Sequence, residues 1–291
     1  MEAAAAHVTQ LVLNGIMTGA ILMMPAIGLT LIYGVLRFPN FAVAAHATIG
    51  AFAGFLANTS LGWPLIPSLF CAFAAAAVFG ALTDEFVLKS FRPSGSITTA
   101  IASVALTIAI ENIVRFFFGN DLRGYVLPIT RDWRIAGLRI GPQQVENLGI
   151  AVVAVGVLFA FLSFARTGKA MRAVADNPML ASIKGINAEM IGRLVSFVGM
   201  GLAGLGGMLT GLDTTIDPLT GFRTILSVFA AAVVGGLGSV PGAVIGALTV
   251  GIGEELCLLV LPPEYRSVVG FLVILVVLTL RPRGILGQSA Y

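Results

Sequence analysis

Most of the chain is made of apolar runs that are about as long as a lipid bilayer is thick. A membrane-spanning helix needs about 20 apolar residues, each adding about 1.5 Å. Runs of this kind lie at about 9–36, 64–88, 97–118, 145–165, 190–211, 241–261 and 267–280, the last one short, and two shorter stretches lie at 42–57 and 223–237. The pattern predicts an all-α polytopic membrane protein, a single domain over residues 1–291, with about 8–9 transmembrane segments, two of them short or broken.

The composition excludes an ordinary soluble protein. Of the 291 residues 57% are hydrophobic and 11% are charged, whereas a soluble domain carries about 25% charged residues. So apolar a chain is also not disordered. The basic residues form no patch interleaved with aromatic residues, so we expect membrane lipid and no nucleic acid among its partners.

Lysine and arginine predict the orientation, because cytoplasmic loops carry an excess of both. When nine segments alternate across the membrane, ten basic residues fall on one side, against six on the other: Arg37, Lys89, Arg92, Arg166, Lys169, Arg172, Lys184, Arg193, Arg281 and Arg283. We therefore expect the N-terminus outside and the C-terminus inside the cell.

Two polar loops interrupt the apolar runs. The outer loop 119–144 alternates around Gly137, which predicts a small β-hairpin. The inner loop 166–189 predicts a short amphipathic helix, with a break at 176–178 and a stop at Gly185. Ala173, Ala181 and Ile183 are expected to be available to a partner. The loop therefore favours a docking site for a cytoplasmic protein, although a solvated connector is the alternative.

Glycine is concentrated where helices must break or pack closely. Fourteen of the 35 glycines lie in the window 199–253, and the stretch 235–242 also contains Ser239 and Pro241. This stretch cannot form an uninterrupted helix at membrane depth. The segment 37–41 interrupts the pattern in the first half. Interrupted segments in both halves point to a transport site, the alternative being ordinary tight loops at the inner surface.

Ionisable residues inside apolar runs are expected to be functional or paired. Glu254 and Glu255 are adjacent, so on a helix they point about 100° apart, and one of them is a candidate for the translocation path. His46 has no carboxylate or cysteine partner nearby in the sequence, which favours a hydrogen-bonded core histidine.

Two further groups of charged residues predict local pairs. Glu111 and Arg115 are spaced to pair on one helix face. Asp84 and Glu85 lie close to Lys89, which predicts an interfacial ion pair.

No enzyme signature accompanies these features. The sequence contains no nucleotide-binding P-loop, no metal-ligand spacing and no Gly-x-Ser-x-Gly turn. We therefore expect no catalytic or metal-binding residue and no cofactor, and a transport role in place of catalysis.

Several motifs together resemble the membrane permease subunits of the branched-chain amino acid (Liv-type) ABC importers. The chain is similar in length to the shorter of that family's two paired permeases. The matching stretches follow the family order over nearly the whole chain: Asn14-Gly15, 28–35 with 39–42, 167–177, 185–187, 235–239 with Gly242, Ala243 and Gly246, and 281–284.

The resemblance implies an ATP-driven importer in the bacterial inner membrane that works by alternating access. The implied partners are a second permease subunit, two cytoplasmic ATPases that use ATP and Mg, an external solute-binding protein and a small amino-acid-like substrate. ATPase coupling is then expected at Gly168, Arg172, Ala173, Asp176, Asn177, Ala181 and Gly185. The translocation path is expected at Asn40, Phe41, His46, Gly235, Gly236, Gly238, Ser239 and Glu254.

One departure from the family pattern leaves the substrate open. Family members carry His-Gly after Asn-Phe-Ala, whereas here Asn40-Phe41-Ala42 continues into Val43-Ala44 and His46 follows later. Related permeases for urea, short amides or aromatic acids share the scaffold. A stand-alone channel or secondary transporter is the remaining alternative.

Overall fold

A computed structural model describes residues 2–127, 131–135, 137–262, 265–281 and 284–287. Pro282 and Arg283 of the tail motif lie outside these residues. The protein is mostly helical, and its helices are α1 (Glu2–Leu36), α2 (Val43–Phe55), α3 (Leu65–Thr83), α4 (Lys89–Phe91), α5 (Ser96–Phe118), α6 (Pro142–Phe164), α7 (Arg166–Asp176), α8 (Pro178–Ile183), α9 (Ala188–Asp213), α10 (Thr220–Gly235), α11 (Val240–Leu256) and α12 (Arg266–Leu280). Single π-helical turns follow α2 and α3, at Leu56–Ser60 and Asp84–Leu88.

Each of the nine predicted segments contains a helix, but fewer of these helices are full-length spans. Within the described residues, six helices are long and apolar enough to cross a membrane: those of Ala6–Leu36, Leu65–Ser94, Ser96–Phe118, Pro142–Phe164, Ala188–Asp213 and Val240–Leu259. Thr220–Gly235 and Val268–Leu280 are apolar but shorter, and α2 has 13 residues. The count of 8–9 crossings is therefore not confirmed.

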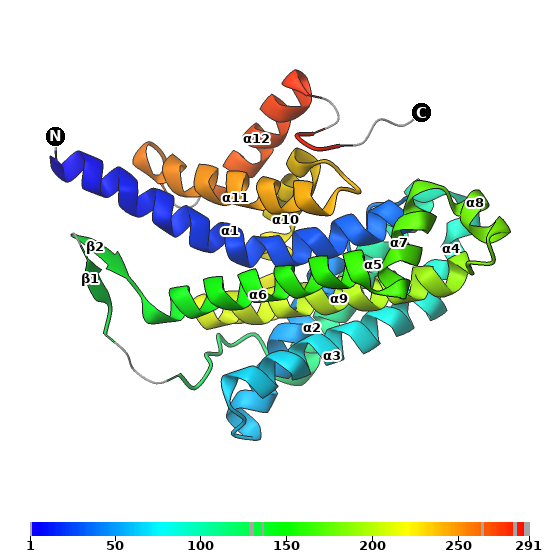
Figure 1. Ribbon diagram of the computed structural model, residues 1–291. Coiled ribbons are helices and arrows are strands. Elements are labelled where there is room, and N and C mark those ends of the chain that lie inside the picture. Colours follow the sequence, from blue (N-terminus) through cyan, green and yellow to red (C-terminus); the bar gives the residue numbers. More distant parts are fainter. Residues whose placement is uncertain (1, 128–130, 136, 263–264, 282–283, 288–291) are drawn as a thin grey trace.

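Helix α1 runs through the middle of the bundle, with α11 on one side and α6 and α9 on the other (Figure 1). Its most apolar window is 78% buried and that of α9 is 72% buried. The two backbones meet where Gly28 faces Gly199, and a Cβ on Gly28 would collide with the Gly199 carbonyl oxygen. Small residues are the usual means by which membrane helices pack closely.

The two ends of the bundle carry different structures. The N-terminus and the hairpin of β1 (Trp133–Ile135) and β2 (Leu138–Ile140) lie at one end, and α4, α7 and α8 lie at the other (Figure 1). The strands are antiparallel, with Trp133 opposite Ile140, which confirms the predicted hairpin. Gln10 of α1 holds β2 with two 2.8 Å hydrogen bonds to the main chain of Arg139.

The loop that precedes the hairpin is also fixed to the bundle. Arg123 and Ile216 exchange two main-chain hydrogen bonds, of 2.9 and 2.8 Å. The Tyr125 hydroxyl donates to the carbonyl of Ala51 in α2 at 2.6 Å, and burial raises the pKa of this hydroxyl. Residues 119–127 therefore cover one end of α2.

The contact between α1 and α9 predicts a strong effect of a single methyl group. We expect Gly28→Ala to lower the stability of the purified protein by about 1–3 kcal/mol, because the methyl group forces two backbones apart. The measurement is the thermal unfolding midpoint in detergent. Gly156→Ala on α6 is the matched control, since nothing lies within 4 Å of the position of its Cβ. Equal midpoints for the two variants would contradict this role of Gly28.

Candidate functional site

The predicted coupling loop forms two short helices joined at Asn177. The Asn177 side chain accepts a hydrogen bond from the Leu180 main-chain N–H at 2.9 Å, and Pro178 occupies the first helical position of α8. Asparagine is a preferred N-cap, and proline at this position interrupts no hydrogen bond of α8. The break predicted at 176–178 is therefore present, and it turns α8 away from α7.

Helix α7 is attached to the bundle by one face. Gly168, Met171 and Val174 are buried, and α7 packs on α6, α1 and α9. A Cβ on Gly168 would lie 2.6 Å from the Leu162 Cα, so only glycine permits this contact with the end of α6. Arg172 and Asp176 are exposed and Ala173 is half-buried, which leaves the opposite face of α7 accessible.

The exposed apolar residues of the loop lie on α8. Met179, Leu180 and Ile183 are 76%, 55% and 72% exposed, whereas Ala181 is 4% exposed and belongs to the core. The prediction that Ala181 is available to a partner is therefore wrong. In a helix, residue 181 points away from the face shared by 179, 180 and 183, and here it packs against the bundle. We call Met179, Leu180 and Ile183 the α8 patch.

The end of α8 is set by a glycine turn. Gly185 has a φ of +82°, and the main-chain N–H groups of Gly185 and Ile186 donate to the carbonyls of Ser182 and Ala181, each at 3.0 Å. These are the two hydrogen bonds of a Schellman motif. Asn187 then caps α9 by accepting from the main chain of Glu189 and Met190 at 3.0 and 3.1 Å. Local hydrogen bonds therefore fix the turn that leads from α8 into α9.

An ion-pair network lies beside the loop at the same end of the bundle. Glu85 binds Lys89 at 2.8 Å and Arg193 at 2.8 Å, and Glu189 binds both Lys89 and Arg193. The ion pair predicted for Lys89 is confirmed, and the network ties the helical turns that follow α3 to the start of α9. Asp84 does not join it, because this buried carboxylate binds Arg92 at 2.5 Å.

The pair predicted for Glu111 and Arg115 from their spacing does not form a salt bridge. Glu111 Oε1 and Arg115 Nε are both buried, and neither atom has a hydrogen-bond partner. Sequence spacing places the two side chains on the same face of α5 but does not set their rotamers.

The glycine-rich stretch forms a tight turn between α10 and α11. Gly236 and Gly238 have φ values of +104° and +92°, and Ser239 caps α11 by accepting from Gly242 N–H at 3.2 Å. A Cβ on Gly235 would collide with the Gly242 carbonyl. The main-chain N–H groups of Ile285 and Leu286 donate to the last carbonyls of α10, at 2.8 and 3.0 Å. The C-terminal segment 284–286 therefore supplies the partners that the broken helix lacks.

The interrupted segment of the first half lies near the same end of α1. Asn40 is fully buried; its Oδ1 accepts from the Ala42 main-chain N–H at 3.0 Å, and its Nδ2 has no hydrogen-bond partner. The Phe41 ring stacks on Phe229 of α10, with centroids 4.4 Å apart and planes inclined by 14°. Gly34 lies beside Gly238. The two interrupted segments are therefore brought to one end of the bundle, although they are far apart in the sequence.

His46 occupies a separate, closed position. It is fully buried, its Nδ1 lies 2.7 Å from the carbonyl oxygen of Ala42, and its Nε2 lies 3.1 Å from Thr83 Oγ1 of α3. Both ring nitrogens therefore have a partner, which is the geometry of a hydrogen-bonded core histidine between α2 and α3.

The two glutamates of α11 face different helices. Ser227 Oγ of α10 donates to Glu254 at 2.5 Å, and Thr18 Oγ1 of α1 donates to Glu255 at 3.4 Å. Both are nearly fully buried, at 3% and 5% exposure. Glu254 lies about four helical turns from Ser239 along α11, so it is far from the glycine turn.

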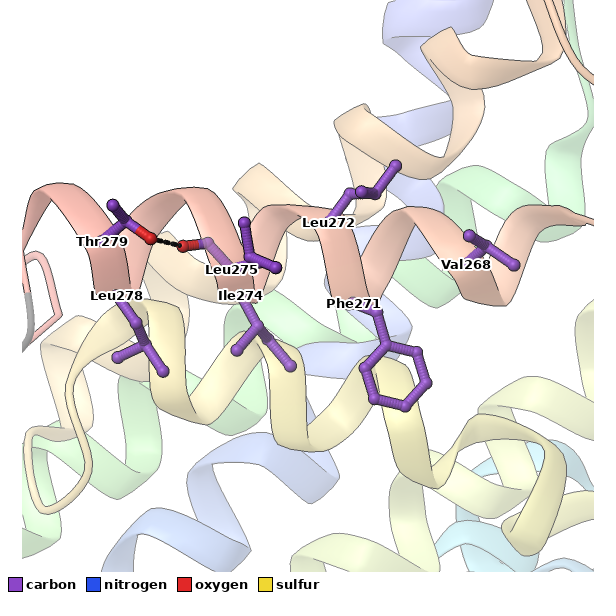
Figure 2. Close-up of a pocket in the computed structure, with 7 residues that line it drawn as sticks. All are labelled: Val268, Phe271, Leu272, Ile274, Leu275, Leu278 and Thr279. Atoms are coloured by element: carbon purple, nitrogen blue, oxygen red, sulfur yellow. Dashed lines mark hydrogen bonds between the residues drawn. The ribbon is translucent and has the colours of Figure 1, made fainter.

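The described residues include a small cavity inside the bundle and a hollow on its surface. A small internal cavity of about 10 Å³ lies where α1, α2, α9 and α10 meet, lined by Ile21, Leu22, Pro25, Ala47, Gly206, Gly207, Thr210, Thr220, Gly221 and Thr224. Its volume matches about one water molecule, so it does not admit an amino acid in this conformation. Figure 2 shows an open hollow along α12, lined by Val268, Phe271, Leu272, Ile274, Leu275, Leu278 and Thr279, without a charged side chain.

For several residues of these sites, no pattern in the sequence predicts their contacts. Phe229 and Ser227 are ordinary residues of an apolar helix, and their partners lie far away in the sequence. The α8 patch has a usable signal, since residues 179, 180 and 183 share a helical face. Among the described residues, no group of three or more His, Cys, Asp or Glu side chains is placed to hold a metal ion.

The chain matches a known protein family over most of its length. The family profile described as "Branched-chain amino acid transport system / permease component" matches residues 11–278. The fold is similar to that of a solved structure, PsaBC from Streptococcus pneumoniae in complex with Fab. The TM-score is 0.50 and the sequence identity 15%, over 93% of this chain and 91% of that one.

Individual permease proteins are also similar to this chain in sequence. The high-affinity branched-chain amino acid transport system permease protein LivH of Escherichia coli strain K12 is 31% identical over 96% of this chain and 95% of its own. BraD of Pseudomonas aeruginosa, a permease protein of the same description, is 30% identical over 97% and 96% of the two chains. This chain therefore belongs to the family of permease components of branched-chain amino acid transport systems.

Proposed function

We propose that the chain is the transmembrane permease subunit of an ATP-driven ABC importer that moves branched-chain or related amino acids into the cell by alternating access. Family membership supports the transport role. The observation that carries the ATP-driven mechanism is the α8 patch, which presents three exposed apolar side chains beyond the bundle end. Such a surface suits a protein partner, because exposed apolar side chains that share one face and are flanked by polar residues mark an interaction site.

The proposal includes partners and an orientation. A second permease subunit completes the pore, an external solute-binding protein delivers the substrate, and two cytoplasmic ATPases receive α7 and α8. ATP and Mg are used by the ATPase chains. The protein lies in the inner membrane as a single domain with 8–9 segments, its N-terminus outside and its C-terminus inside. The opposite placement of the hairpin and of α8 along the bundle supports this orientation (Figure 1).

In this proposal the two broken segments and Glu254 belong to the translocation path. Their support is unequal. Phe41, Gly235, Gly236, Gly238 and Ser239 lie at the bundle end that carries α7, where a gate on the cytoplasmic side is expected. Asn40 has a buried donor without a partner, which a different conformation can satisfy. His46 is already fully paired between two helices, so we assign it to the structural support of this end.

The first prediction that follows from the proposed function concerns ATPase docking. We expect the double variant Leu180→Asp/Ile183→Asp to lose copurification with the ATPase subunits, because two carboxylates replace exposed apolar contacts. The fold is retained, since both side chains point away from the core. The measurement is the amount of ATPase recovered with the tagged permease from cells that express the whole importer.

A matched control is available at the other end of the bundle. Leu122 is 66% exposed in the loop beside the hairpin, and Leu122→Asp is expected to keep the ATPase bound. Loss of ATPase with both variants, or with neither, would show that α8 is not the docking surface.

The second prediction concerns the path. We expect Glu254→Gln, which keeps the size and one acceptor oxygen, to lower the uptake rate about tenfold, equivalent to ~1.4 kcal/mol, if the carboxylate charge acts on the substrate. The thermal unfolding midpoint should stay near that of the wild type, because an amide oxygen still accepts from Ser227. Wild-type uptake would place Glu254 outside the path.

The third prediction concerns the substrate. In vesicles that contain the complete importer and its solute-binding protein, uptake of labelled leucine should depend on ATP and be competed by isoleucine and valine. Uptake competed only by urea, short amides or aromatic acids would assign the chain to another branch of the family. ATP-independent uptake by this chain alone in liposomes would indicate a channel or secondary transporter.

A further inference from the structure

Arg37 joins the coupling loop to the interrupted segment of the first half. It follows the last residue of α1, and its guanidinium Nη2 donates to the carbonyl oxygen of Ala175 in the last turn of α7 at 2.5 Å. The carbonyls in the last turn of a helix lack intrahelical partners and carry partial negative charge, so an arginine binds there favourably.

The backbone of Arg37 has an uncommon conformation. Among the described residues, Arg37 is the one non-glycine residue with positive φ, at +57°. Glycine is the usual residue at such a helix end, because a Cβ is unfavourable in the left-handed region. An arginine kept there in a strained conformation is explained by what its side chain reaches, namely the end of α7.

The residues that follow Arg37 are fixed to α5. The Arg37 carbonyl accepts from Ser96 Oγ at 3.1 Å, and the Phe41 main chain accepts from Thr107 Oγ1 at 3.1 Å and donates to Ser103 Oγ at 2.9 Å. Phe38 is 1% exposed, so the segment between these bonds is also packed.

The far end of this segment contacts α10. The Phe41 ring stacks on Phe229, which lies less than two helical turns before the glycine turn at Gly235. An unbroken series of contacts therefore leads from the last turn of α7, through Arg37 and the segment 38–41, to the helix that precedes this turn.

We infer that Arg37 is a positioning residue for coupling, which transmits displacement of α7 to α10 through residues 38–41. This inference rests on the proposed function. A residue in this role matters to the efficiency with which ATP hydrolysis drives transport, and less to assembly, because Arg37 is exposed and lies outside the α8 patch.

The test compares variants that separate the backbone from the side chain. Arg37→Gly relieves the strained φ but removes the guanidinium, Arg37→Lys retains one charged donor, and Arg281→Ala removes another exposed arginine as the matched control. The measurement is substrate taken up per ATP hydrolysed by the complete importer in proteoliposomes. ATPase copurification is measured alongside it.

We expect Arg37→Gly to keep the ATPases bound while uptake per ATP falls at least about fivefold, the lower end of coupling between distant sites. Arg37→Lys should recover part of the loss, and Arg281→Ala should match the wild type. If Arg37→Gly takes up as much substrate per ATP as the wild type, the inference is overturned. It is also overturned if Arg37→Gly loses the ATPases and Arg37→Lys restores them, because Arg37 is then only a structural cap.

A second measurement tests the transmitted motion directly. Spin labels at Lys169 on α7 and at Phe222 on α10, both exposed, should change separation when ATP binds to the wild-type importer. In Arg37→Gly the change should be lost, and an unaltered change overturns the inference. Absence of any ATPase partner for the wild-type chain would instead contradict the proposed function itself.

Discussion

Helix α1 occupies the centre of the bundle because its small residues let neighbouring backbones touch it. Lipid tails are as apolar as leucine, so burial of apolar side chains gives little driving force between membrane helices, and close packing must supply it. Gly28 meets Gly199 of α9 on one side, while Gly15 and Gly19 meet the backbone of α11 on the other. These contacts set where the end of α1 lies, and thereby where Arg37 and the segment 38–41 begin.

Backbone hydrogen bonding imposes the second constraint. A helix that breaks within or beside a membrane leaves carbonyl groups that need partners. At the end of α10 the partners come from the C-terminal segment, at the end of α7 from Arg37, and at the end of α8 from its own glycine turn. All three helix ends lie in the half of the bundle that carries α7 and α8, so the elements that we propose to move are linked by hydrogen bonds and not only by packing.

Features that depend on neighbours within a few residues were predictable. The break at Asn177-Pro178 and the hairpin around Gly137 are present as expected, because capping and turn formation are local. Features that depend on a side chain's surroundings were not. Ala181 is buried because α8 lies against the bundle, and Asp84 pairs with Arg92 because the π-helical turn at Asp84–Leu88 changes the spacing along the helix. Within the described residues six helices are long and apolar enough to cross a membrane, and the count of 8–9 segments is not confirmed because α2, α10 and α12 are shorter.

The sequence by itself determined that this is a polytopic membrane protein, because its few charges cannot cover a soluble surface, and its ordered motifs pointed to the permease family. Only the tertiary structure decided which distant residues meet. The stacking of Phe41 on Phe229, the bond from Ser227 to Glu254, and the reach of Arg37 to α7 join segments far apart along the chain. Such contacts depend on how whole helices pack. The sequence around either residue of a pair does not indicate which distant residue it contacts.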